Sequence, residues 1–227
     1  MQKKFMILVV GLFCFSLCAE SDVVRKISGT AELSDQHCAS LEINGEATLT
    51  KVTVDKLLSI NGLGTLNECT FCNVNINGDV TMTKGTVAGT LETNGTCKID
   101  GVEIKGACDL NGDVKIDNAT IHALSEVTGS FKALNTTFYN QLTAESEKIS
   151  LHKCTTKDIR IKKTEPEPSI WRSFLNLFFK STDNTQEVRL TDTQVQGDII
   201  FEANNGIVYL AGSSKVSGKI IGGRVAG

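Results

Sequence analysis

Six cysteines follow residue 19, and they are the residues whose chemistry needs explaining first. They are Cys38, Cys69, Cys72, Cys97, Cys108 and Cys154. Cys69 and Cys72 have the spacing of Cys-x-x-Cys redox and metal motifs, but no second such pair and no nearby His pair follows. Buried free cysteine behaves as a small hydrophobic residue. The sequence therefore favours structural cysteines over a Cys69–Cys72 disulfide, and it favours that disulfide over metal or redox chemistry.

Two carboxylates and three lysines hold fixed positions in a repeat. Asp100 and Asp117 occupy one position, and Lys98, Lys115 and Lys132 line up two residues before it. Two carboxylates at a defined separation can hydrolyse a glycosidic bond. A ladder of alternating charge on exposed strands, however, needs no ligand, and short repeats leave no long loops to build a cleft. We therefore predict an exposed charge ladder.

The histidines and the standard motifs give no further catalytic signal. His37, His122 and His152 fall at different points of the repeat, so they cannot form one stacked cluster. The sequence contains no G-x-S-x-G elbow and no P-loop. We expect no enzymatic activity, no catalytic residue, no metal site and no cofactor.

The charge balance limits the partners. Lys plus Arg number 23 and Asp plus Glu number 26, a net charge of −3, which excludes nucleic-acid binding through bulk positive charge. The chain is 41% hydrophobic and 22% charged, which excludes a disordered tail and a polytopic membrane protein.

Glycine recurs every 16 or 17 residues, and this repeat dominates the sequence. The positions are Gly29, Gly45, Gly62, Gly78, Gly95, Gly112 and Gly129. Five of these glycines follow an asparagine: Asn44, Asn61, Asn77, Asn94 and Asn111. Because Asn-Gly readily supplies the positive φ of a sharp corner, we predict a corner turn at each of these five pairs. Asparagines at a fixed corner can also stack in a hydrogen-bonded ladder.

Apolar residues recur within the repeat at a spacing of two, which is typical of strands. A period of 17 is too short for two helices, and consecutive hairpins would not keep one register over seven repeats. We predict an all-β fold, a single-stranded parallel β-helix solenoid with coils of about 17 residues stacked about 4.8 Å apart. The hexapeptide pattern of left-handed helices is absent, which favours right-handed winding. About ten coils would make a rod roughly 45–50 Å long.

Four regions follow from the pattern. Residues 1–19 combine a basic start, a short apolar run and a terminal Ala19, which is typical of a secretory signal peptide. Lipid anchoring at Cys18 is less favoured, because Leu17 fits a lipobox poorly. Residues 20–161 carry the repeats, 162–187 a proline-containing linker and an amphipathic helix, and 188–227 the last coils. We expect an exported protein located in the periplasm, on the outer surface or outside the cell.

The interruption at 162–187 contains the most hydrophobic segment outside the repeat. We expect a short helix from Ile170 to Lys180 with one broad apolar face. That face consists of Ile170, Trp171, Phe174, Leu175, Phe178 and Phe179. It either packs on the solenoid or docks on a partner protein or a membrane surface, so it is the candidate interaction site.

The glycine-marked coils carry a recurring segment, Ile76-Asn-Gly-Asp-Val80 and Leu110-Asn-Gly-Asp-Val114. In this they resemble bactofilins, the bacterial polymer-forming cytoskeletal proteins, and exported adhesin-like β-helix proteins. The similarity covers residues 27–160 and 188–227. It implies a parallel β-helix that self-associates end to end, and it identifies no functional residue.

These features predict a non-catalytic exported cell-envelope protein, a structural scaffold or an adhesin-like rod. The ends of a solenoid are unpaired strand edges, so we expect association with itself or with other envelope proteins. Two alternatives stay open. One is a glycan-binding or polysaccharide-acting β-helix that uses its outward charges, and the other is a peripheral membrane or partner adaptor that uses the aromatic helix.

Overall fold

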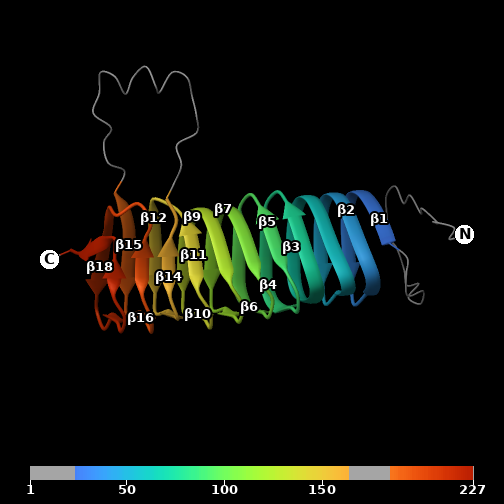
Figure 1. Ribbon diagram of the computed structural model, residues 1–227. Helices are drawn as coiled ribbons and strands as arrows, with labels where there is room; N and C mark the ends of the chain where they lie inside the picture. The colour runs from blue at the N-terminus through green and yellow to red at the C-terminus, as the bar shows by residue number, and fades with distance from the viewer. Residues whose placement is uncertain (1–23, 164–184, 227) are drawn as a thin grey trace, which may run out of the picture.

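The computed structural model describes residues 24–163 and 185–226. These residues form one elongated parallel β-solenoid of about 11 turns with coils of about 17 residues (Figure 1). The predicted all-β solenoid and its coil length are thereby confirmed, and the described residues contain no helix. The predicted signal peptide (1–19) and the predicted helix Ile170–Lys180, with all six residues of its apolar face, lie outside the described residues.

The strands follow the coils in chain order. They are β1 (Val24–Ser34), β2 (His37–Thr50), β3 (Thr53–Asn77), β4 (Val80–Val87), β5 (Leu91–Asn94), β6 (Cys97–Ile104), β7 (Cys108–Asp117), β8 (Thr120–Ile121), β9 (Ser125–Leu134), β10 (Thr137–Phe138), β11 (Leu142–Glu145), β12 (Lys148–His152), β13 (Thr155–Thr156), β14 (Ile159–Ile161), β15 (Gln186–Thr191), β16 (Gln194–Val195), β17 (Ile199–Phe201), β18 (Gly206–Ala211), β19 (Lys215–Val216), β20 (Ile220–Ile221) and β21 (Gly223–Val225).

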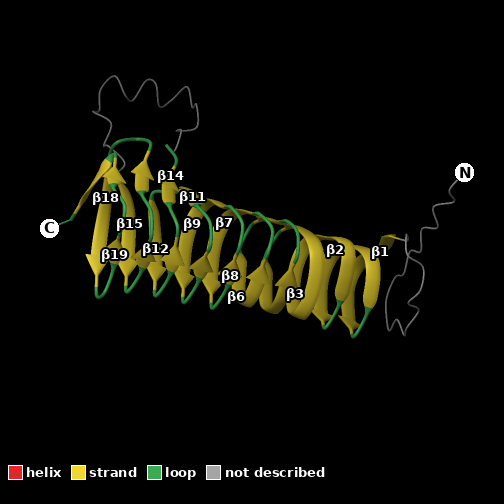
Figure 2. Ribbon diagram, turned by 60° about the horizontal axis from the view of Figure 1, so that its bottom comes forward, coloured by secondary structure: helices red, strands yellow, loops and turns green. Residues whose placement is uncertain are grey.

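Each coil between the first and the last described coil pairs in parallel with the coil before it and the coil after it (Figure 2). Towards the C-terminus three separate strands make one coil, as in β12–β13–β14 and β15–β16–β17. Nearer the N-terminus the strands merge into long bent strands, of which β3 has 25 residues. The interruption between β14 and β15 leaves the register intact, because Ile149 pairs with Val188 across it.

The repeated glycines form one corner of the coil. Their φ angles lie between 99° and 141° from Gly29 to Gly129. A Cβ on Gly45, or on any later glycine of this column, would lie closer than 3.0 Å to the carbonyl oxygen of the glycine beneath it. From Gly45 to Gly129 the positive φ and this contact therefore require glycine for neighbouring coils to approach to the strand-pairing distance.

A second corner uses left-handed backbone at positions that the sequence pattern did not predict. Its residues have φ between 48° and 67°, and most are not glycine. They are Asp35, Lys51, Glu68, Lys84, Gly101, Asn118, Asn135, Lys153, Asp192 and Gly212. In most coils the residue that follows the left-handed position is buried, so the turn directs that side chain into the core.

Inward side chains stack into one continuous core that runs from Ile27 to Val208. Phe131 and Phe138 meet edge to face in its middle, with ring centroids 6.2 Å apart. Cys38 is only partly buried, whereas Leu58, directly after the exposed Leu57, enters the core.

Candidate functional site

Four of the predicted corner asparagines form a hydrogen-bonded ladder along the rod. Asn61 donates to Asn44 at 2.9 Å, Asn77 to Asn61 at 3.1 Å, and Asn94 to Asn77 at 3.1 Å, each from Nδ2 to Oδ1. Asn111 instead donates to Asp109 in its own strand, at 3.2 Å. The ladder joins each coil to the next, and this is a structural role.

Acidic and amide side chains at other corners accept hydrogen bonds from the backbone of the next coil. Asp79 Oδ1 accepts from the Thr96 N–H at 3.0 Å, and Asp192 Oδ1 accepts from the Ser213 N–H at 2.9 Å. Asn73, Asp158 and Asp198 do the same. The hydrogen bond from the Thr96 backbone lowers the pKa of Asp79, and that from Ser213 lowers the pKa of Asp192.

Cys69 belongs to a buried polar column that sequence reasoning missed. Its Sγ accepts from the Val52 N–H at 3.4 Å and donates to the Asn67 carbonyl at 3.2 Å. The residues at the equivalent position of later coils make the same kind of backbone contacts through oxygen or sulfur. They are Thr136, Cys154, Thr193 and Ser214. Between Cys69 and Thr136 the same position holds Gly85, Val102 and Ala119. Cys154 stands between Thr136 and Thr193, and that alternation of cysteine with threonine was the signal in the sequence.

None of the six described cysteines forms a disulfide with another of them. Cys69 is buried in the column just described and Cys72 is partly exposed, so the structure shows no Cys69–Cys72 disulfide. Burial raises the pKa of Cys97 to about 11 and that of Cys108 to about 12. The buried thiols therefore stay protonated at neutral pH, which makes them poor nucleophiles and poor metal ligands.

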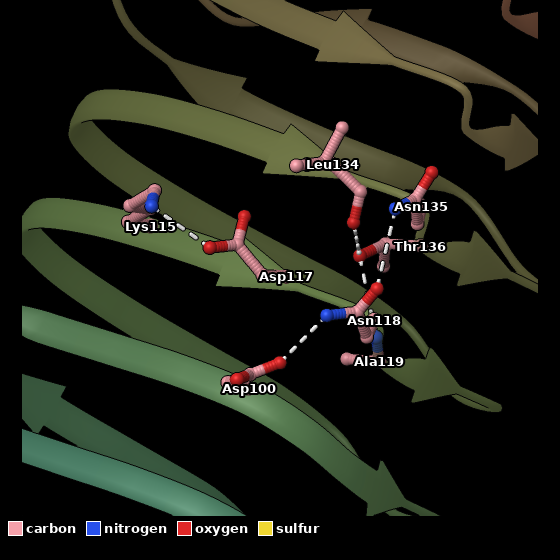
Figure 3. Close-up of polar contacts among 8 residues, drawn as sticks. All are labelled: Asp100, Lys115, Asp117, Asn118, Ala119, Leu134, Asn135 and Thr136. Atoms are coloured by element: carbon pink, nitrogen blue, oxygen red, sulfur yellow. Dashed lines mark hydrogen bonds and ion pairs between the residues drawn. The ribbon is translucent and has the colours of Figure 1, made fainter.

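Three members of the charge ladder, Asp100, Lys115 and Asp117, lie on neighbouring coils (Figure 3). Lys115 Nζ is 2.8 Å from Asp117 Oδ2, and this hydrogen bond raises the pKa of Lys115. Asp100 Oδ1 accepts from Asn118 Nδ2 at 2.7 Å, and Asn118 Oδ1 accepts from Asn135 at 3.2 Å. The other oxygen of Asp117, Oδ1, is buried and has no hydrogen-bond partner among the described residues.

A shallow hollow of about 210 Å³ lies over this ladder. Its polar lining consists of Thr81, Thr83, Lys98, Asp100, Lys115 and Asp117. One oxygen of each carboxylate is held by a neighbouring amide or ammonium group, so the two do not form a free acid–base pair. The hollow offers ammonium, hydroxyl and carboxylate groups to a polar ligand.

The histidines are far apart in the repeat, as expected from their positions, and each has its own neighbours. His37 Nε2 lies 2.7 Å from Asp55 Oδ2. His122 Nε2 lies 3.0 Å from Glu103 Oε1, and the His122 ring stacks on Tyr139 with centroids 5.1 Å apart. Within residues 24–163 and 185–226, no three His, Cys, Asp or Glu side chains come together in a way that could hold a metal ion.

The C-terminal end of the described solenoid leaves core side chains uncovered. Val216 and Ile220 are only partly buried, and Val225 is 48% exposed. The residues directly beneath these three, one coil earlier, are Val195, Ile199 and Val208, and each is 0% exposed. The contrast arises because β19, β20 and β21 have no further described coil above them.

This end is also basic. Residues 203–226 include Lys215, Lys219 and Arg224 and contain no Asp or Glu. A second hollow, of about 510 Å³, lies beside the end and is lined by Thr185, Asn204, Gly206, Gly222 and Arg224 among others. The end therefore combines apolar core side chains, unpaired strand edges and positive charge.

No family model, no curated protein and no solved structure matches this chain. Among the described residues, none belongs to a helix long and apolar enough to cross a membrane.

Proposed function

We propose that this chain is a non-catalytic, exported structural protein, a rod that associates with further copies through its ends. One observation supports the proposal above all: the last described coil carries the inward column residues Leu210, Val216, Ile220 and Val225 without a covering coil. Complete burial of such side chains is worth roughly 1.5–3 kcal/mol each. Unpaired parallel strand edges add backbone donors and acceptors that another coil could satisfy.

The chemistry of the interior and of the charged face agrees with a structural role. The buried thiols are protonated, and Lys115 is paired with Asp117 within one strand of the charge ladder. The corner asparagines bond to one another and so join neighbouring coils. A rod whose two ends bind further copies would serve as a scaffold or as an adhesive fibre in the cell envelope.

Finer features of the proposal rest on the sequence pattern alone. They are right-handed winding, removal of residues 1–19 on export, and a helix from Ile170 to Lys180 whose apolar face contacts the solenoid, a partner or a membrane.

The experiment is sedimentation velocity of residues 20–227 with substitutions at the end and in the middle of the rod. Ile221 at the end and Leu124 in the middle are matched, with exposures of 44% and 43%. We expect Ile221→Glu combined with Val225→Glu to reduce the association constant at least tenfold, while Leu124→Glu combined with Leu63→Glu leaves it unchanged. Equal behaviour of both double variants would refute association through this end.

A second candidate function is binding of a polyhydroxylated glycan at the charge ladder. The hollow of about 210 Å³ with its ammonium, hydroxyl and carboxylate lining favours it. Titration with neutral and acidic oligosaccharides tests it, with the Asp100→Asn, Asp117→Asn double variant as the comparison. Absence of binding by the unsubstituted protein would eliminate this candidate.

A further inference from the structure

We propose that the association is head to tail: the C-terminal edge of one copy binds the free edge of β1 in the next, with Ala31 stacked over Val225. The inference rests on the proposed function, because it specifies the polarity and register of the same self-association. The occupant of the C-terminal end is therefore a second copy of this chain.

The two edges are complementary in hydrogen bonding. Among the described residues β1 pairs only with β2, and β19, β20 and β21 pair only with the coil below them. β1 and β21 lie at opposite ends of the rod, and they run in the same direction because every pairing between them is parallel (Figure 1). Head-to-tail stacking thus continues the parallel strand pairing. Two like ends could meet only if one rod were rotated end over end, and their strands would then pair antiparallel.

The register follows from the side-chain columns. Val225 pairs with Val208, and the pairings of successive coils lead down one inward column to Ala31. Gly223, two residues before Val225, therefore stands in the corner column that begins with Gly29. A β1 strand placed on β21 in this register puts Gly29 over Gly223 and Ala31 over the exposed Val225.

Gly29 itself points to a neighbour beneath it. From Gly45 to Gly129, each glycine of the column makes room for the carbonyl oxygen of the glycine below. At Gly29 nothing among the described residues lies within 4 Å of the Cβ position. The space that its missing side chain leaves is the space that the Gly223 carbonyl of a second copy would occupy.

Charge disfavours the joining of two C-terminal ends. Such a contact would bring Lys215, Lys219 and Arg224 together with their counterparts, and no acid in residues 203–226 offsets the repulsion. β1 carries Arg25 and Lys26 as well as Glu32, but Lys26 is paired with Glu42 and Arg25 donates to Gln36 within its own copy. In the proposed register Thr30 lies opposite Arg224, so Glu32 is its diagonal neighbour across the junction, where opposite charges attract.

A contact between two different surfaces does not close on itself unless the rotation forms a ring. Because the contact continues the axis of a straight solenoid, repeated head-to-tail stacking produces an open filament.

Cysteine cross-linking tests the register directly. Thr30 and Arg224 are both exposed, and paired residues of neighbouring strands have Cα atoms about 4.8 Å apart, within the range that a disulfide spans. In a Cys38→Ser, Cys72→Ser background, Thr30→Cys and Arg224→Cys are introduced into separate, differently tagged chains. After mild oxidation we expect disulfide-linked heterodimers in most of the mixed sample and none in either chain alone. Thr65→Cys, on an exposed strand in the middle of the rod, is the matched control and should not link to Arg224→Cys.

Sedimentation of the same samples before cross-linking tests self-association separately from its polarity and register. Association with disulfides only between two Arg224→Cys chains, or only between two Thr30→Cys chains, would overturn the head-to-tail inference and leave self-association standing. Association without any disulfide at this pair would overturn the register. A monomer at every concentration would overturn the proposed function itself.

Discussion

The backbone N–H of Val52 points at the Sγ of Cys69 on the next coil, 3.4 Å away. The same sulfur donates to the carbonyl of Asn67, so one thiol satisfies the chain on both sides of a corner. A residue that looks like a redox candidate in the sequence is thus part of the hydrogen bonding between coils.

This contact predicts how Cys69 tolerates substitution. Cys69→Ser should retain most of the stability, because a hydroxyl makes the same two hydrogen bonds. Cys69→Val should lower the free energy of unfolding by about 1–3 kcal/mol, because it leaves the buried Val52 N–H without an acceptor. Urea denaturation measures both. Cys97→Val is the control, since valine already fills that column at Val80 and Val114, and an equal loss in both valine variants would argue against the hydrogen bond.

The buried thiols predict a loss of stability at high pH. Burial raises the pKa of Cys97 to about 11 and that of Cys108 to about 12, from an ordinary value of 9.0. The stabilisation is complete below pH 9 and disappears as the pH rises through 11 to 12, because the unfolded chain loses these protons first. The slope is about 1.4 kcal/mol per pH unit for each thiol within that window.

Chemical denaturation between pH 8 and about 11 in the presence of reductant measures this slope. The Cys97→Val, Cys108→Ala double variant should have a flatter profile than the unsubstituted protein. Superimposable slopes would show that other groups cause the alkaline loss.

The aspartates that accept backbone hydrogen bonds between coils predict how the stability falls at low pH. The pKa values of Asp79 and Asp192 lie below the ordinary 3.8, so their contribution to stability is present above that pH and is lost as the pH falls through the lowered values. Asp79→Asn with Asp192→Asn retains an acceptor oxygen and removes the titration. We expect the stability of this double variant to decline less steeply below pH 4 than that of the unsubstituted protein. Circular dichroism measures the unfolding. Asp113→Asn removes one carboxylate at a position where the structure shows no hydrogen bond from the next coil, so it is the matched control variant.

The glycine corner predicts that the stability cost of a Gly→Ala substitution depends strongly on its position along the rod. Gly62→Ala places a Cβ against the carbonyl oxygen of Gly45 and should cost on the order of 3 kcal/mol. Gly29→Ala meets no described neighbour, so in dilute monomer it should cost only the strain of its positive φ, about 1 kcal/mol. Thermal or urea unfolding of the two variants gives the comparison. A Gly29→Ala protein as unstable as Gly62→Ala would contradict the stacking explanation.

The regular part of this fold was predictable because each coil of a solenoid repeats the same pattern of residues in the sequence. The spacing of Gly45, Gly62 and Gly78 predicted the coil length, and each of these glycines is required by a backbone contact. The second corner could not be predicted in the same way. It places Lys51, Glu68 and Lys84 in left-handed backbone, residue types that carry no turn signal, and stacking of the coils imposes the conformation.

The candidate site was predictable only in part. The apolar character of the last coil was visible in the sequence, but the exposure of Val225 and the partial exposure of Ile220 became evident only from the coil beneath them. The match between Gly29 and Gly223 could not be seen in the sequence, because the late coils lengthen. Gln194 and Lys215 are paired although they are 21 residues apart, so the simple period of 17 no longer aligns the columns.

Sedimentation velocity of the unsubstituted protein, residues 20–227, over a wide concentration range with reductant present tests the central claim most directly. An end-to-end rod predicts species that grow with concentration beyond the dimer and become more elongated as they grow. A compact monomer whose sedimentation coefficient does not change with concentration would contradict the account.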